Sequence, residues 1–233
     1  MRFKLVKDSK KLILCFLGYS FLPDSLKHLE LGEYGLGVLY DYSDGDFSLD
    51  ALNLRCCKPH NTSASLNLLS RDFFGKDIYL IAFSMGVFAA NLAFNNAPVF
   101  NIKYALAING TPLGIDELYG IKQSDFKSSM DNFNFALFKK GCFLKELSRV
   151  DFGFNENAKA ELNALYNAAI NAPKQKSKIA WDKAIISKKD LIFPPKAVQN
   201  YFRNCEPKCA LKSINAPHFA FYNFTTWEQI LAL

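Results

Sequence analysis

The chain has 233 residues, of which 50% are hydrophobic, 15% aromatic and 21% charged. These proportions allow one sizeable buried core and exclude a disordered chain, a collagen-like repeat and a small disulfide-held protein. The formal net charge of +6 is mildly basic and falls short of a nucleic-acid-binding profile. Six scattered cysteines without a CxxC pair indicate reduced thiols, so we expect a cytoplasmic protein.

Short apolar runs rich in β-branched and aromatic residues predict the strands of one sheet. Runs without polar alternation are typical of strands buried on both faces of a mainly parallel sheet. Phe3–Val6 is expected to add a strand at the edge. The run from Leu12 could pass for part of a signal peptide, but no A-x-A-like site follows and Gly18 interrupts it, which favours a buried strand. The expected buried strands are Leu12–Leu17, Leu36–Tyr42, Ile78–Phe83, Tyr104–Ile108, Ala184–Ile186 and Ala210–Ile214.

Helical segments separate these strands and are predicted over Val87–Asn95, Pro195–Asn204 and Thr226–Leu231. The succession of strand, helix and strand is typical of an α/β fold with right-handed crossovers.

One internal region, residues 112–178, breaks this rhythm. It shows no convincing strand and predicts several helices, the last over Asn157–Ala172 and ended by Pro173. We therefore expect an α/β core formed by residues 1–111 and 179–233, with 112–178 inserted as a small helical cap over a site. A pair of ordinary crossover helices is the alternative.

The strongest local motif is Ala82-Phe83-Ser84-Met85-Gly86, which lies between a predicted strand and a predicted helix. A serine with small residues two positions before and two positions after it, at such a turn, is typical of the nucleophile elbow of α/β hydrolases. The turn exposes the serine oxygen at the helix N-terminus, where the N–H of Met85 can stabilise an oxyanion. A serine that only caps the helix is the plain alternative.

Serine needs a base to become a nucleophile, and α/β hydrolases carry their triad in the order serine, acid, histidine. His28 and His60 precede Ser84, whereas His218 follows it, in the loop after the last predicted strand. His218 is therefore the candidate base, rather than an ordinary surface histidine.

The acid is expected in the loop after the penultimate strand. Asp190 lies there, where its carboxylate would orient His218 and stabilise the imidazolium. Asp182 is the rival, but it precedes the strand.

The second oxyanion donor normally comes from the loop after an early strand. The backbone N–H of Tyr19 is the candidate, and Gly18 would allow the backbone to approach closely. A plain glycine turn explains this segment equally well.

Two cysteine groups invite comparison with metal sites. Neither Cys56-Cys57-x2-His60 nor Cys205-x3-Cys209 has the paired spacing of a zinc site, so no metal is expected.

Seven segments together resemble the BioG-type esterases, which are pimeloyl-[acyl-carrier protein] methyl ester esterases of biotin synthesis. The resemblance runs from the first strands to the carboxyl terminus and is not seen between about residues 50 and 76. It implies an α/β-hydrolase fold with a small cap, a Ser84-Asp190-His218 triad and no cofactor. The matching segments are Phe16-Leu-Gly-Tyr-Ser20, Tyr40-Asp-Tyr42, Ala82-Phe-Ser-Met-Gly-Val87, Ile108-Asn-Gly-Thr111, Trp181, Ser187-Lys-Lys-Asp-Leu-Ile-Phe193 and Pro217-His-Phe-Ala-Phe221.

The resemblance also implies an acyl carrier protein as the partner. Residues 174–212 contain ten Lys or Arg and three acidic residues, which is either a solvated basic face or a surface that attracts an acidic carrier. Neither nucleic acid nor a membrane is expected as a partner, and we expect a monomer. The candidate docking residues are Lys139, Lys140, Lys188, Lys189 and Lys196.

Three cap aromatics, Phe126, Phe133 and Phe138, are candidates to line an acyl channel, although aromatics at such spacing also form plain core. The alternatives for the whole chain are a broad short-chain esterase or thioesterase, and a non-catalytic binding protein of the same fold.

Overall fold

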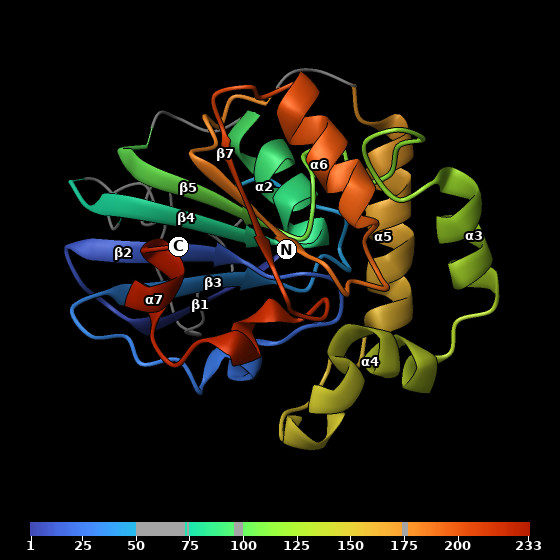
Figure 1. Ribbon diagram of the computed structural model, residues 1–233, viewed down its shortest axis with the longest axis horizontal. Helices are drawn as coiled ribbons and strands as arrows, with labels where there is room; N and C mark the ends of the chain where they lie inside the picture. Colours follow the sequence, from blue (N-terminus) through green and yellow to red (C-terminus); the bar gives the residue numbers. More distant parts are fainter. Residues whose placement is uncertain (50–72, 74, 96–99, 174–176) are drawn as a thin grey trace, which may run out of the picture.

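A computed structural model describes residues 1–49, 73, 75–95, 100–173 and 177–233. Within these residues the strands form one seven-stranded sheet in the order β1-β3-β2-β4-β5-β6-β7 (Figure 1). β1 pairs antiparallel with β3 at one edge, and every other pairing is parallel. The expected α/β class and the edge strand are confirmed. The strands are β1 (Arg2–Lys7), β2 (Lys11–Phe16), β3 (Gly35–Tyr40), β4 (Asp77–Phe83), β5 (Ile102–Ile108), β6 (Lys183–Ser187) and β7 (Ala210–Ile214).

Most expected bounds differ from the structure by one or two residues. The strand expected to reach Tyr42 ends at Tyr40, because Asp41 takes a φ of 51° that extended backbone does not allow. The helix expected from Val87 begins at Met85, directly after the turn at Ser84. The predicted loop from Cys56 to Ser65 lies outside the described residues.

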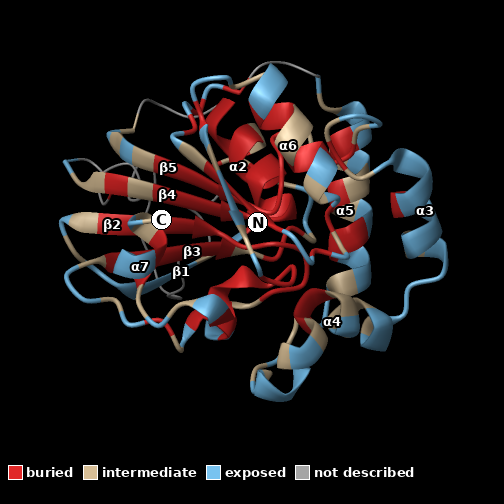
Figure 2. Ribbon diagram, viewed as in Figure 1, coloured by how far each residue is buried: buried red, intermediate tan, exposed pale blue. Residues whose placement is uncertain are grey.

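Helices cover both faces of the sheet. α2 (Met85–Asn95) and α6 (Pro195–Asn204) lie on one face, and α7 (Trp227–Leu231) lies on the other (Figure 1). Successive strand residues serve opposite faces: Leu14 packs in the core beneath α2, whereas Cys15 packs with Trp227. The central strands are consequently buried on both sides (Figure 2).

The region between β5 and β6, residues 112–178, is called the cap segment below. It contains α3 (Gln123–Asp131), α4 (Phe135–Phe143), the 3₁₀ turn η3 (Leu144–Arg149) and α5 (Ala158–Asn171), and its described residues form no strand longer than an isolated bridge. The three helices lie beyond the carboxyl ends of the parallel strands (Figure 1). None of the described helices has the length and apolarity to cross a membrane.

Candidate active site

Ser84 occupies a strained turn between β4 and α2. Its φ is 56°, a left-handed conformation that costs a non-glycine residue roughly 1–2 kcal/mol. Two backbone hydrogen bonds hold the turn: Ser84 N–H donates to the Ile108 carbonyl at 2.8 Å, and the Ser84 carbonyl accepts from Val87 N–H at 3.0 Å. The side chain is thereby held at the carboxyl end of the strand, beside the N-terminus of α2.

Small residues surround this turn because larger ones would collide with backbone. A Cβ at Gly86 would lie 2.3 Å from the Phe16 carbonyl oxygen, and a Cβ at Gly110 would lie 2.1 Å from the Ser84 carbonyl oxygen. A Cβ at Gly18 would lie 2.8 Å from the Ser84 Cβ. The loops after β2 and β5 therefore touch the serine turn directly.

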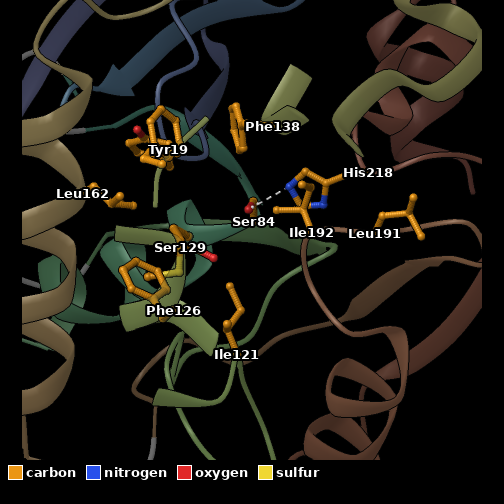
Figure 3. A pocket seen from close by; sticks show the side chains of 12 residues that line it. Tyr19, Ser84, Ile121, Phe126, Ser129, Phe138, Leu162, Leu191, Ile192 and His218 are labelled. Atoms are coloured by element: carbon orange, nitrogen blue, oxygen red, sulfur yellow. Dashed lines mark hydrogen bonds between the residues drawn. The ribbon is translucent and has the colours of Figure 1, made fainter. Parts of the chain in front are cut away.

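Ser84, His218 and Asp190 form one hydrogen-bonded row. His218 Nε2 lies 2.9 Å from Ser84 Oγ (Figure 3). On the other side of the ring, His218 Nδ1 lies 2.7 Å from Asp190 Oδ2. All three residues are buried. Ser84 thus has an imidazole within hydrogen-bond reach, and that imidazole has a carboxylate on its other side, which is the geometry that an activated serine requires.

The carboxylate of Asp190 is itself fixed. Its Oδ1 accepts from the backbone N–H groups of Ile192 and Phe193, both at 2.8 Å. These two donors take the place of water as hydrogen-bond partners of the buried carboxyl group. The rival Asp182 lies at the other end of β6, where its side chain accepts from Ala105 N–H at 2.8 Å. The structure therefore brings Asp190, and not Asp182, to the histidine.

Asn109, in the loop after β5, holds the histidine loop. Its Nδ2 donates to the His218 carbonyl at 2.7 Å and to Ser187 Oγ at 2.8 Å, while its Oδ1 accepts from Ser187 N–H at 2.8 Å. This positioning role was not predicted from the sequence. The available signal was an Asn-Gly pair directly after a buried strand, with Asn109 at a φ of 49°.

An apolar cavity of about 150 Å³ opens over Ser84 and His218 (Figure 3). The structure brings all three expected cap aromatics to it, together with five residues that the sequence did not single out. Leu191 is 70% exposed, which places it at the mouth of the cavity. The lining consists of Tyr19, Ser84, Met85, Ile121, Phe126, Ser129, Phe133, Phe138, Leu162, Leu191, Ile192 and His218.

The two amides expected as oxyanion donors lie beside Ser84. Met85 N–H is at the first position of α2, and Tyr19 N–H belongs to the loop that touches Ser84 through Gly18. Neither donates to another group among the described residues. Both remain available to a ligand oxygen.

The candidate docking cations belong to α4, to the loop after β6 and to α6. The Nζ of Lys139 lies 5.2 Å from the Phe135 ring centre and 5.0 Å from that of Phe154. A Cβ at Gly141 would lie 2.8 Å from Ile192, so α4 packs against the loop that follows β6. Lys140, Lys188, Lys189 and Lys196 are exposed.

Metal-binding side chains do not cluster in the part of the chain that the structure describes. Cys56, Cys57 and His60 lie outside that part.

Solved structures share this architecture. An esterase from Exiguobacterium antarcticum matches with a TM-score of 0.65 at 14% identity, covering 95% of this chain and 89% of that one. A bromoperoxidase from Bacillus anthracis matches with a TM-score of 0.61 at 14% identity, covering 99% and 93%. The parallel sheet, the serine turn and these likenesses define the α/β-hydrolase fold.

The family follows from closer matches. A family model described as pimeloyl-ACP methyl esterase BioG matches residues 65–230, so the chain belongs to the BioG family and is a hydrolase of the esterase type. A crystal structure of BioG from Haemophilus influenzae matches with a TM-score of 0.78 at 27% identity, covering 99% of this chain and 100% of that one.

Two curated relatives complete the comparison. An uncharacterized protein of Haemophilus influenzae is 29% identical over 96% of this chain and 95% of its own length. A malonyl-[acyl-carrier protein] O-methyltransferase of Bacteroides fragilis is 30% identical over 80% of this chain, but the match spans only 35% of the methyltransferase.

Proposed function

We propose that this protein hydrolyses the methyl ester of pimeloyl-[acyl-carrier protein], releasing methanol, through a Ser84-His218-Asp190 triad. The observation that carries the proposal is the hydrogen-bonded row from Ser84 Oγ to the Asp190 carboxylate, which opens into an apolar cavity. Membership of the BioG family indicates which substrate is proposed, because the family is described as pimeloyl-ACP methyl esterases.

In the first step Ser84 Oγ attacks the ester carbonyl while His218 Nε2 takes the serine proton. The imidazolium that forms faces the Asp190 carboxylate at 2.7 Å, which stabilises the positive charge. The Tyr19 and Met85 amides donate to the carbonyl oxygen as it becomes an oxyanion. Collapse of the tetrahedral intermediate breaks the bond to methoxide, which leaves as methanol with the proton from His218.

In the second step water hydrolyses the acyl-enzyme. His218 takes a proton from water as the water oxygen attacks the acyl carbon, and then returns the proton to Ser84 Oγ. The product is the pimeloyl carboxylate, whose other end stays on the carrier. Water is the only co-substrate that this sequence of steps requires.

The lining of the cavity suits an aliphatic acyl chain. Phe126, Phe133 and Phe138 from the cap segment provide an acyl channel, with Leu162 from α5. Apolar side chains favour the methylene chain and offer no partner for a charged end group. A free carboxylate in place of the methyl ester is therefore disfavoured in this channel. The affinity for the product should consequently be lower than the affinity for the ester.

The cap segment and the loop after β6 provide the carrier surface. Lys140, Lys188 and Lys189 are exposed on two segments that meet beside the cavity mouth, with Lys139 on α4 and Lys196 on α6. An acidic carrier would be attracted to these cations before the acyl chain enters.

The test is hydrolysis of pimeloyl-carrier methyl ester by the purified protein, followed by mass spectrometry of the carrier. The proposal expects a mass loss of one methylene with the thioester intact. Release of free carrier would instead indicate a thioesterase. No change in the carrier, with the protein folded, would favour a non-catalytic binding protein.

A further inference from the structure

The mechanism does not use Glu161, a buried carboxylate on α5. Its Oε2 accepts from Ser20 N–H at 3.1 Å and from Asn155 Nδ2 at 2.8 Å, and its Oε1 accepts from Tyr42 N–H at 3.4 Å. Its exposed fraction is 0%. A carboxylate buried this deeply is costly, so its three N–H donors indicate a specific task.

That task concerns the turn after β2. Phe21 N–H donates to the Gly18 carbonyl at 3.3 Å, which closes a β-turn over Gly18–Phe21. Ser20 is the third residue of the turn and has a φ of 66°, whereas Tyr19 is not among the residues with positive φ. These signs define a type II turn, which favours glycine where Ser20 stands.

The cap segment holds Ser20 from both sides. Glu161 accepts its N–H, and the Ser20 carbonyl accepts from Asn155 N–H at 2.9 Å. The Ser20 hydroxyl is buried and has no hydrogen-bond partner among the described residues, so the side chain does not stabilise the unfavourable φ. The strained backbone is therefore held by groups that lie more than a hundred residues away in the sequence.

The turn in question is the one that touches the nucleophile. The Tyr19 N–H lies in the same peptide plane as the Gly18 carbonyl, which closes the turn, and Gly18 packs against Ser84. Relaxation of Ser20 to a negative φ would flip the Tyr19–Ser20 peptide plane. That plane is joined at the Tyr19 Cα to the Gly18–Tyr19 plane, which carries the Tyr19 N–H, so the flip would displace this N–H. The position of the Tyr19 amide thus depends on what holds Ser20.

We propose that Glu161 is a positioning residue for ester hydrolysis: its carboxylate locks the Gly18–Phe21 turn so that the Tyr19 amide points at the developing oxyanion. The proposal rests on the proposed function, because it assigns Tyr19 as an oxyanion donor. Asn155 assists by donating from Nδ2 to both Glu161 and Asp41, the latter at 2.9 Å.

The test is Glu161→Gln, assayed with p-nitrophenyl butyrate at pH 8. Burial and the charge of Asp41 raise the pKa of Glu161 to about 7, so wild-type Glu161 is mostly ionised there. Glutamine replaces one acceptor oxygen with an NH₂ group that cannot accept. We expect kcat to fall roughly 10- to 100-fold with KM within about threefold. The reason is that a misplaced Tyr19 amide stabilises the transition state less and leaves binding of the ground-state ester almost unchanged.

Two measurements separate positioning from general damage. Affinity for a trifluoromethyl ketone, which forms a tetrahedral adduct on serine, should fall by about the same factor as kcat. Glu156→Gln is the matched control, because Glu156 is an exposed glutamate five residues away, and it should leave kcat unchanged. Unchanged kcat in a folded Glu161→Gln protein would overturn the proposal.

A rescue gives the sharpest test. Ser20→Gly removes the unfavourable φ and an unpartnered hydroxyl, so the loss from Glu161→Gln should be several-fold smaller in that background. An undiminished loss would show that Glu161 acts by another route and would overturn the proposal.

Two further variants close the remaining gaps. Should Glu161→Gln not fold, Asn155→Ala should show a smaller loss, again in kcat, and an unchanged kcat would overturn the proposal. Ser84→Ala separates the two proposals. Full activity of Ser84→Ala would overturn both the proposed function and this inference. If Ser84→Ala is inactive and Glu161→Gln has the wild-type kcat, only the inference is overturned.

Discussion

At the scale of single residues, the site contains residues with unfavourable backbone conformations that are held in place by hydrogen bonds. Ser84, Asn109 and Ser20 all have positive φ, and each is bonded through its backbone or side chain to a different loop. Such strain persists where surrounding structure over-determines it, and it often marks functional sites.

The proposed triad predicts non-additive losses. Ser84→Ala and His218→Ala should each lower kcat by several powers of ten, and the double variant should lose little more, because the two residues act as a unit. Asp190→Asn should cost less than either. Kinetics of the four proteins on one ester, with phenylmethylsulfonyl fluoride labelling to locate the serine, test this. Labelling of a serine other than Ser84 would contradict the assignment.

Glu161 predicts a pH dependence of stability. Its pKa is raised to about 7 in the folded protein from the ordinary value of 4.5, because burial and Asp41 oppose the charge. The Asp41 carboxylate is itself paired with Arg2 at 3.1 Å. The contribution of Glu161 to stability is therefore full below the ordinary pKa and is lost as the pH rises through the folded one.

Urea unfolding at pH 5 and pH 8 measures this effect. The wild-type free energy of unfolding should fall between these values by on the order of 1–3 kcal/mol more than that of Glu161→Gln, which has no charge to bury. Equal slopes in the two proteins would show that Glu161 does not titrate in this range.

At the scale of elements, the carboxyl ends of β2, β4, β5, β6 and β7 bring their loops together. The loops are packed so closely that glycine is required where backbone meets backbone, as at Gly110 against the Ser84 carbonyl. The site is thus formed by the loops at five strand ends and not by one loop.

Gly110→Ala should therefore displace the serine turn. Its Cβ would lie 2.1 Å from a backbone oxygen that cannot rotate away, and we expect a loss of about 1–3 kcal/mol in stability together with lower kcat. Gly153→Ala is the control, since the added Cβ has no described residue within 4 Å apart from its chain neighbours. Thermal unfolding and kinetics of both variants provide the measurement, and similar behaviour of the two would refute the packing argument.

At the scale of the whole molecule, the positive charge is unevenly distributed along the chain, with a surplus in residues 174–212. Part of that stretch, residues 174–176, lies outside the described residues. If the exposed lysines attract an acidic carrier, their contribution should be to the encounter rate and should be screened by salt.

Changing Lys188, Lys189 and Lys196 together to Glu should lower kcat/KM for the carrier-linked ester and weaken its salt dependence. A small ester should react almost normally, so the diagnostic quantity is the ratio between the two substrates. An equal loss of kcat/KM on both substrates, or no loss on the carrier substrate, would indicate that these lysines form an ordinary solvated face and do not bind the carrier.

A second triple variant controls for net charge. Lys7, Lys10 and Lys103 lie toward the amino ends of the parallel strands, away from the cavity, and their change to Glu alters the net charge equally. The carrier-to-small-ester ratio should stay near the wild-type value in this protein.

The sequence by itself determined the α/β class and the chain order of Ser84, Asp190 and His218, because buried strands and tight turns leave local patterns of a few residues. Chain order also favoured Asp190 over Asp182, since only the former follows its strand. The roles of these residues remain predictions for the experiments above.

The tertiary structure alone decided which distant groups meet. Glu161 bonds to Ser20 across 141 positions, and Leu162 and Leu191 reach the cavity from separate segments. No local pattern distinguishes a glutamate on the inner side of α5 from an exposed one, because its burial depends on how the cap segment packs over the loops after β2 and β3. Long-range packing therefore decided which residues support the candidate site, whereas local sequence patterns indicated its candidate reacting groups.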